Sequence, residues 1–126
     1  MNKQQVFQAL RERGAAKAVV KFSGGNDEGG CEGIEFYDQL GNPAGEMEEH
    51  WGDSEWDPVK QKYVEKPLTK EQKLSKALCA PVYDKYYSFA GDFYVYGQVV
   101  WDVSAGKVTM DGTEEVAHGE SFEEEL

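Results

Sequence analysis

Alternation of apolar and polar side chains predicts two strands near the start of the chain. Over residues 16–22, the even positions are apolar and the odd positions carry Lys17, Val19 and Lys21, which is the period of two expected for a strand with one buried face. A second alternating run covers residues 31–37, after the glycine-rich stretch Ser23–Gly30. The simplest arrangement of the two runs is a β-hairpin closed by Ser23–Gly30.

The run Phe93–Val103 predicts a third strand, because large apolar residues occupy most of its odd positions. Ser104–Gly106 has the length and the glycine of a hairpin loop, so Lys107–Met110 is expected to return as its partner. If Phe93–Val103 lay at a sheet edge, its unpaired backbone would favour a homodimer.

Helical spacing predicts two helices. Asn2–Arg13 carries an apolar stripe with polar residues around it. Thr69 with Gln72 three residues later fits a capping box, and apolar residues follow at helical spacing as far as Tyr86. Pro81 lacks a backbone donor, so we expect this central helix to kink or restart there.

Glu46–Lys66 shows no clear period, and we interpret it as a long ordered loop with a short strand at Lys62–Val64. Loops of this length are uncommon in compact domains and often functional. Together the patterns predict an α+β domain over residues 1–118, with an antiparallel sheet of about four to five strands, and an acidic flexible tail over residues 119–126.

Charge adds a strong bias to this picture. The net charge is −11, and the chain has eleven carboxylates but no Lys or Arg between Lys21 and Lys60. Such a charge disfavours phosphate backbones and anionic membranes as partners and favours basic ones. The N-terminus lacks an apolar signal-type segment and no long apolar run is present, so we expect a cytoplasmic protein.

The acidic region also contains tryptophans, which a purely solubilising segment would not need. Aromatic anchors supply desolvated contact, and surrounding carboxylates speed encounter with a basic surface. We therefore predict a partner-binding surface, and its residues are Glu46, Glu48, Glu49, Trp51, Asp53, Glu55, Trp56 and Asp57. The alternative is a housekeeping domain whose acidic face is only solvated.

The glycine-rich stretch has two further interpretations. A phosphate-binding loop is disfavoured because the stretch has no lysine and leads into a strand. A divalent cation could use Asn26, Asp27 and Glu28, although only their composition, and not their spacing, fits a calcium loop. A small divalent-metal-binding protein is therefore a second alternative to the partner-binding protein.

Catalytic and zinc signatures are weak. Cys31 and Cys79 form no Cys-x-x-Cys pair, and with His50 and His118 they are scattered along the chain, so a structural zinc site is disfavoured. The acidic neighbour of Cys31 would raise the pKa of its thiol, the wrong direction for a nucleophile. We expect no enzyme and no cofactor.

Two segments carry a resemblance: Val20–Gly29 and Val99–Thr109. With them the chain is similar to small, uncharacterised α+β proteins of bacteria and their mobile elements, a likeness that implies no catalytic residues. In size and charge it also resembles anti-CRISPR and other phage counter-defence inhibitors. That resemblance implies a small, acidic, non-enzymatic protein. Because a nucleic-acid-binding groove is the commonest large basic cleft, the acidic surface itself predicts a DNA mimic that blocks a nuclease or nucleic-acid-guided complex.

Overall fold

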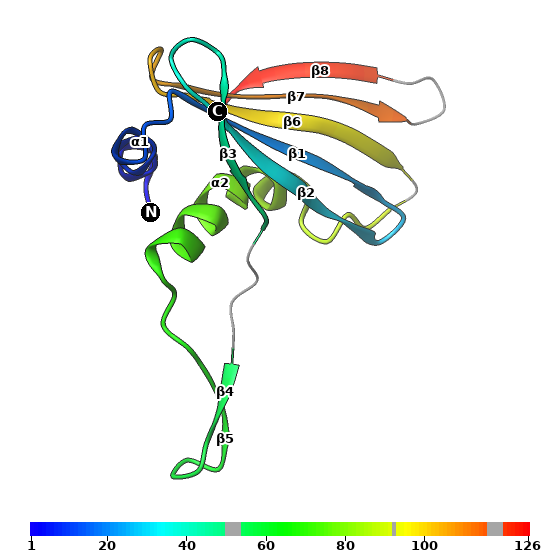
Figure 1. Ribbon diagram of the computed structural model, residues 1–126. Coiled ribbons are helices and arrows are strands. Elements are labelled where there is room, and N and C mark those ends of the chain that lie inside the picture. Colours follow the sequence, from blue (N-terminus) through cyan, green and yellow to red (C-terminus); the bar gives the residue numbers. More distant parts are fainter. Residues whose placement is uncertain (50–53, 92, 116–119) are drawn as a thin grey trace.

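Six antiparallel strands form one sheet, and both helices pack on the same face of it (Figure 1). The computed structural model describes residues 1–49, 54–91, 93–115 and 120–126. The sheet order is β3-β2-β1-β6-β7-β8, and β4 pairs with β5 in a separate two-stranded sheet. The elements are α1 (Lys3–Glu12), β1 (Lys17–Gly25), β2 (Glu28–Tyr37), β3 (Pro43–Met47), β4 (Ser54–Asp57), β5 (Lys62–Glu65), α2 (Lys70–Tyr86), β6 (Tyr94–Asp102), β7 (Lys107–Glu115) and β8 (Glu120–Glu125). The α+β class is confirmed, with more strands than the four or five predicted.

The predicted N-terminal hairpin is confirmed, but its loop is much shorter than Ser23–Gly30. The strands β1 and β2 pair as far as Gly25 and Glu28. Only Asn26 and Asp27 form the turn, with φ angles of 53° and 70°, as in the primed turns that match the twist of a hairpin. The glycines of the predicted loop therefore lie within the strands.

Their lack of side chains makes room for Phe89. A Cβ on Gly24 would lie 2.4 Å from the Phe89 ring, and one on Gly29 would lie 2.7 Å from it. The backbone is joined as well, because the Asp27 N–H donates to the Phe89 carbonyl at 2.9 Å. The glycine-rich stretch is thus a docking surface for the chain that follows α2.

Both helices begin at capping boxes. Asn2 caps α1 with Gln5, and Thr69 caps α2 with Gln72, as the sequence predicts for α2. The helix α2 runs through Pro81 as a single element and does not restart there. No helix among the described residues is long and apolar enough to cross a membrane.

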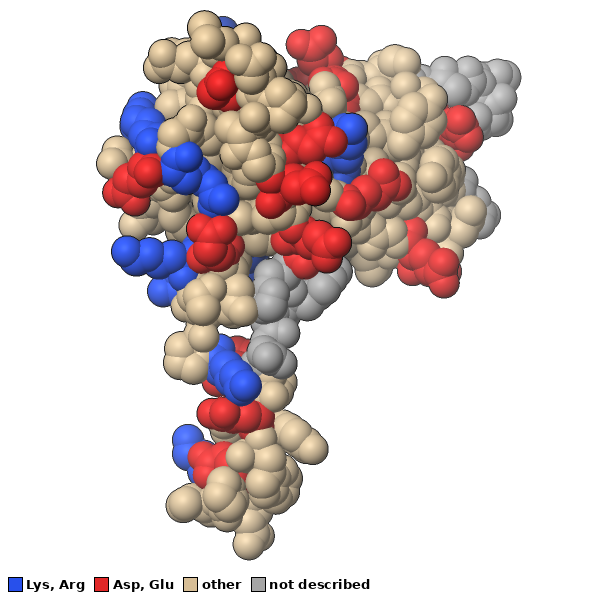
Figure 2. All heavy atoms as spheres, in the orientation of Figure 1, with Lys and Arg blue, Asp and Glu red and all other residues tan. Residues whose placement is uncertain are grey.

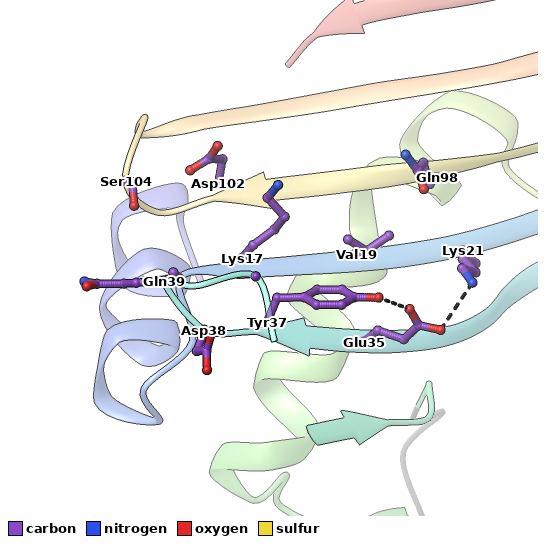
Figure 3. A pocket seen from close by; sticks show the side chains of 12 residues that line it. Lys17, Val19, Lys21, Glu35, Tyr37, Asp38, Gln39, Gln98, Asp102 and Ser104 are labelled. Carbon is purple, nitrogen blue, oxygen red and sulfur yellow. Dashed lines mark hydrogen bonds and ion pairs between the residues drawn. The ribbon is translucent and has the colours of Figure 1, made fainter. Parts of the chain in front are cut away.

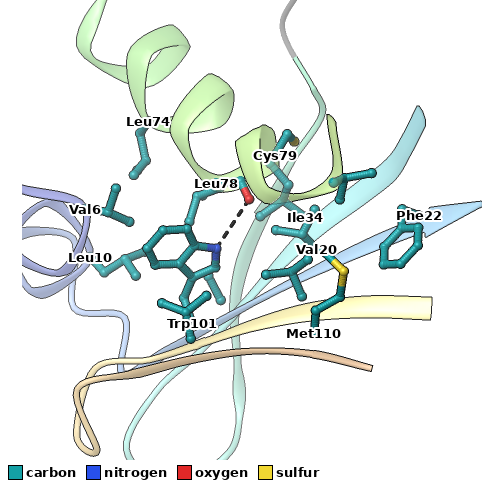
Figure 4. Packing of buried hydrophobic residues seen from close by; sticks show 14 of the residues in the cluster. Val6, Leu10, Val20, Phe22, Ile34, Leu74, Leu78, Cys79, Trp101 and Met110 are labelled. Atoms are coloured by element: carbon teal, nitrogen blue, oxygen red, sulfur yellow. Dashed lines mark hydrogen bonds between the residues drawn. The ribbon is translucent and has the colours of Figure 1, made fainter. Parts of the chain in front are cut away.

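The core lies between the helices and the inner face of the sheet (Figure 4). Trp101 of β6 is at its centre, with its ring edge-on to Phe7 of α1 at a centroid distance of 5.9 Å. Its indole N–H donates to the Leu78 carbonyl of α2 at 3.3 Å. Trp101 therefore contacts both helices. Apolar residues on alternate strand positions, such as Val20 and Ile34, fill the rest.

The position of Phe93–Val103 in the sheet, which the sequence leaves open, is now defined, and two predictions about the strands are corrected. The strand β6 lies inside the sheet, paired with β1 and β7, so it offers no free edge for a homodimer. Residues 46–66 are not one long loop, since they also contain the end of β3 and all of β4, but the short strand predicted at Lys62–Val64 is confirmed as β5. Residues 120–125 are not a tail outside the domain, because β8 pairs with β7. Lys85 of α2 bonds Glu124 at 2.8 Å and lies over the Phe122 ring, which offsets the negative charge of this strand.

Candidate functional site

A hairpin of β4 and β5 projects away from the rest of the molecule (Figure 1). We call residues 54–65 the arm. Its two strands pair from Ser54 with Glu65 to Asp57 with Lys62. The Asp57 carboxylate accepts from the backbone N–H groups of Val59 and Lys60 at 2.9 and 3.1 Å, which fixes the tip. The arm is therefore an ordered hairpin whose own hydrogen bonds define it.

Large apolar side chains on the arm are open to solvent. Trp56 is 54% exposed, Tyr63 is 72% exposed and Val59 at the tip is 90% exposed. Trp56 and Tyr63 are cross-strand neighbours whose rings meet edge-on at 5.4 Å. Apolar groups gathered on a projecting element, without a core beneath them, are typical of interaction sites.

The negative charge is not concentrated on the arm. Glu55, Asp57 and Glu65 are balanced there by Lys60 and Lys62, with Lys66 directly after β5. Carboxylates gather instead on the body, as Figure 2 shows. A groove along β2 and β3 is lined by four of them together with Lys21 of β1. We call these four carboxylates the acidic strip: Glu32, Glu35, Glu46 and Glu48.

The structure separates the residues of the predicted partner-binding surface. Glu55, Trp56 and Asp57 lie on β4, and Glu46 and Glu48 belong to the acidic strip. Trp51 and Asp53 lie outside the described residues. Glu49 differs from the rest, because its side chain is half-buried and points toward two cysteines.

Cys31, Glu49 and Cys79 form an inner cluster. One side-chain donor atom of each lies within 4.8 Å of the others. Cys31 comes from β2, Glu49 follows β3 and Cys79 belongs to α2, so tertiary packing alone brings them together. The hydrogen bond with Cys31, followed by burial, raises the pKa of the Cys79 thiol far above its ordinary value. A thiol held protonated in this way is a poor nucleophile.

Tyr83 borders the inner cluster. It hydrogen-bonds the Glu49 carboxylate, and its hydroxyl oxygen accepts from the Cys31 backbone N–H at 3.4 Å. Burial, followed by the hydrogen bond to Glu49, raises the pKa of the Tyr83 phenol well above its ordinary value. The phenol therefore stays protonated at neutral pH and donates a hydrogen bond to Glu49.

A family model matches residues 1–126, the whole chain, and its description is a family of unknown function, DUF6878. The chain belongs to the DUF6878 family. No curated protein and no solved structure matches it. For this DUF6878 protein, function has to be inferred from the arm, the acidic strip and the inner cluster.

The outer face of the sheet has a hollow of about 640 Å3 over β1, β2 and β6 (Figure 3). Glu35 accepts from the Tyr37 hydroxyl and from Lys21 there. These bonds, the one from Tyr37 first, lower the pKa of the Glu35 carboxyl. A carboxylate held ionised by its partners does not suit general-acid chemistry, which needs a raised pKa.

The residues of the predicted metal alternative lie at an exposed hairpin tip. Asn26, Asp27 and Glu28 are exposed at the tip of the β1–β2 hairpin. Among the described residues, neither Asp27 nor Glu28 belongs to a group of three converging Cys, His or carboxylate side chains. The turn instead uses two backbone N–H groups to hold the chain after α2.

The inner cluster has a sequence signal that lies outside the apolar stripe of α2. Ser75, Cys79 and Tyr83 follow one another at intervals of four residues, which places them on one face of α2. A buried apolar row, Leu74, Leu78 and Val82, runs beside them. A polar row next to the apolar stripe of a helix was the available clue. Its partners on β2 and after β3 are not predictable from helical spacing.

Proposed function

We propose that the protein is a non-enzymatic binding protein that docks on a basic protein partner through the arm. The single observation that carries this proposal is the exposure of Trp56, Val59 and Tyr63 on a hairpin that projects from the body. Exposed aromatic side chains at the centre of an interface supply most of the binding energy in many complexes. The arm would thus be the anchor, with Trp56 in the role that its sequence position suggested.

The acidic strip supports a basic partner. Like charges meet across it, because Glu35 of β2 is the register partner of Glu46 of β3. Lys21 pairs with Glu35 at 3.2 Å, so the four carboxylates leave the strip with a net negative charge, and complementary charge speeds association with a positive surface. The net charge of −11 acts in the same direction at longer range.

The partner class follows from this chemistry. Large basic clefts on proteins are most commonly built for nucleic acids, so a nuclease or nucleic-acid-guided complex is the target that we propose. Occupation of such a cleft would make the protein an inhibitor, as in the counter-defence proteins that it resembles in size and charge.

The test is site-specific photo-crosslinking. A photo-reactive residue at Val59 is expected to capture a basic partner, whereas the same group at Gln8, exposed on α1, is expected to capture nothing comparable. The captured protein is then expressed and its affinity measured. Trp56→Ala should weaken binding by about 30-fold, the equivalent of roughly 2 kcal/mol for an interface anchor.

A matched control separates the arm from exposed tyrosine in general. Tyr63→Ala should weaken binding, and Tyr96→Ala, at an exposed tyrosine of β6, should not. Reversal of Glu46 and Glu48 to lysine should slow association and flatten its salt dependence, while reversal of Glu123 and Glu125 on β8 should do so less. Equal effects of the two charge reversals would leave net charge as the sole cause, and the housekeeping alternative would then stand.

A further inference from the structure

The inner cluster has the donor chemistry of a transition-metal site. Cys31, Glu49 and Cys79 offer two sulfur atoms and one carboxylate oxygen within 4.8 Å of one another. In a tetrahedral zinc site with Zn–S bonds of about 2.3 Å, neighbouring sulfur ligands lie about 3.8 Å apart. The two sulfur atoms would therefore need to approach by no more than about 1 Å to share one ion.

The carboxylate is already oriented by a neighbour. Tyr83 hydrogen-bonds Glu49, and the hydroxyl of buried Ser75 donates to the Glu48 carbonyl at 3.0 Å. Both of these contacts come from α2 and fix the short segment that carries Glu49. Carboxylates that bind metals are characteristically held by such outer hydrogen bonds.

Gly30 keeps space open beside this arrangement. A Cβ at this position would lie 2.8 Å from the Tyr83 hydroxyl oxygen and 3.6 Å from a Glu49 carboxylate oxygen. The backbone φ of Gly30 is not in the left-handed region, so conformation does not demand glycine there. Glycine is favoured at position 30 because the polar groups of Tyr83 and Glu49 approach the β2 backbone closely there.

We propose that Cys31, Cys79 and Glu49 bind one zinc ion, with Tyr83 and Ser75 as positioning residues. Two thiolates favour zinc over calcium or magnesium, which require oxygen ligands. The ion displaces the two thiol protons, and its two positive charges reduce the charge of the three ligands from −3 to −1. Three protein ligands leave the fourth tetrahedral position for water or for a donor from a partner.

The first measurement is a calorimetric titration of reduced, metal-free protein with zinc alone, in which one ion per chain is expected. Cobalt then serves as a spectroscopic probe, because thiolate coordination gives a near-ultraviolet charge-transfer band. Tyr83→Phe should weaken zinc binding by roughly 10–100-fold. Cys31→Ser should weaken zinc binding more than this and should reduce the cobalt band to about half. Glu49→Gln should weaken zinc binding but keep the full band.

The matched control is Glu48→Gln, since Glu48 is an exposed acid next to Glu49 and contributes only its backbone carbonyl. This variant should bind zinc like the wild type. Because Cys31 is half-buried and Glu49 lies near the surface, their variants keep the test usable if Cys79→Ser does not fold. The proposal is overturned if the reduced wild type gives no heat and no cobalt band, or if Cys31→Ser and Glu49→Gln bind zinc as tightly as Glu48→Gln.

Discussion

Replacement of Gly24 with alanine tests whether the glycines of the β1–β2 hairpin are required by packing. The new Cβ would lie 2.4 Å from a Phe89 ring carbon and 2.7 Å from the Gly29 Cα. Carbon atoms in ordinary contact are about 3.5–4.0 Å apart. Phe89 is fully buried and stacks on Tyr86 at a centroid distance of 5.4 Å, so the ring has no free space into which to retreat.

The expected cost follows from these contacts. Overpacking of a filled core costs about 1–3 kcal/mol, and full loss of a buried phenylalanine costs about 3–5 kcal/mol. The lower entropy of an unfolded chain with alanine returns about 0.4–1 kcal/mol. We therefore expect Gly24→Ala to lower the free energy of unfolding by about 1–2 kcal/mol.

Gly33→Ala is the matched control. Gly33 lies on β2, the neighbouring strand, and a Cβ there meets nothing within 4 Å. This variant should be neutral or more stable by up to about 1 kcal/mol. Urea unfolding followed by circular dichroism should thus separate the two variants by about 2 kcal/mol, or roughly 8 °C in thermal midpoint.

A double mutant completes the test. If the Cβ of the Gly24→Ala variant meets the Phe89 ring, then Gly24→Ala should cost less in a Phe89→Ala background, with a coupling energy of about 1 kcal/mol or more. Strictly additive costs, or a Gly24→Ala variant as stable as Gly33→Ala, would refute the packing argument.

Three further predictions concern the arm, the core and the outer face of the sheet. Replacement of residues 54–65 by a short glycine-serine linker should change the thermal midpoint, measured by calorimetry, by only a few degrees. The reason is that β4 and β5 pair with each other and lie apart from the main sheet. Loss of the folded state would instead show that the arm stabilises the body. Trp101→Phe should cost about 1–3 kcal/mol in urea unfolding, since the ring shrinks and the bond to the Leu78 carbonyl is lost, and an unchanged midpoint would contradict the central role of this indole. The carboxyl of Glu35, observed by NMR, should titrate below the ordinary range of glutamate because Tyr37 donates a hydrogen bond to it, and Tyr37→Phe should move this titration to higher pH. The contribution of Glu35 to stability is present above the unfolded-state pKa. It is lost as the pH falls through the lowered folded-state pKa.

The sequence alone determined the elements whose information is local. Alternation over residues 16–22 and 31–37 marks two strands and the hairpin that they form, although its turn is only Asn26 and Asp27 and not the predicted Ser23–Gly30. Thr69 and Gln72 determine the start of α2 within one turn. These features depend on residues a few positions apart, so a single sequence reveals them.

The tertiary structure decided the order of the strands and the fate of the charged segments. The strands that pair with β6 are β1 and β7. This pairing depends on how the sheet packs against α1 and α2, and no local sequence pattern predicts it. The acidic run at 120–125 looks like a solvated tail until Lys85 of α2 supplies the opposite charge and the backbone pairs with β7. Glu46 and Glu48 end on the acidic strip, whereas Glu55, Trp56 and Asp57 end on the arm, because β3 belongs to the main sheet and β4 to the arm.

The inner cluster shows the same limit most directly. Cys31 and Cys79 are 48 positions apart and look like two unrelated thiols in the sequence. They meet because the polar row of α2 packs over β2, and the chain leaving β3 brings Glu49 to the same point. Side-chain chemistry was readable from the sequence, but convergence is a property of packing between elements, and only the folded structure could supply it.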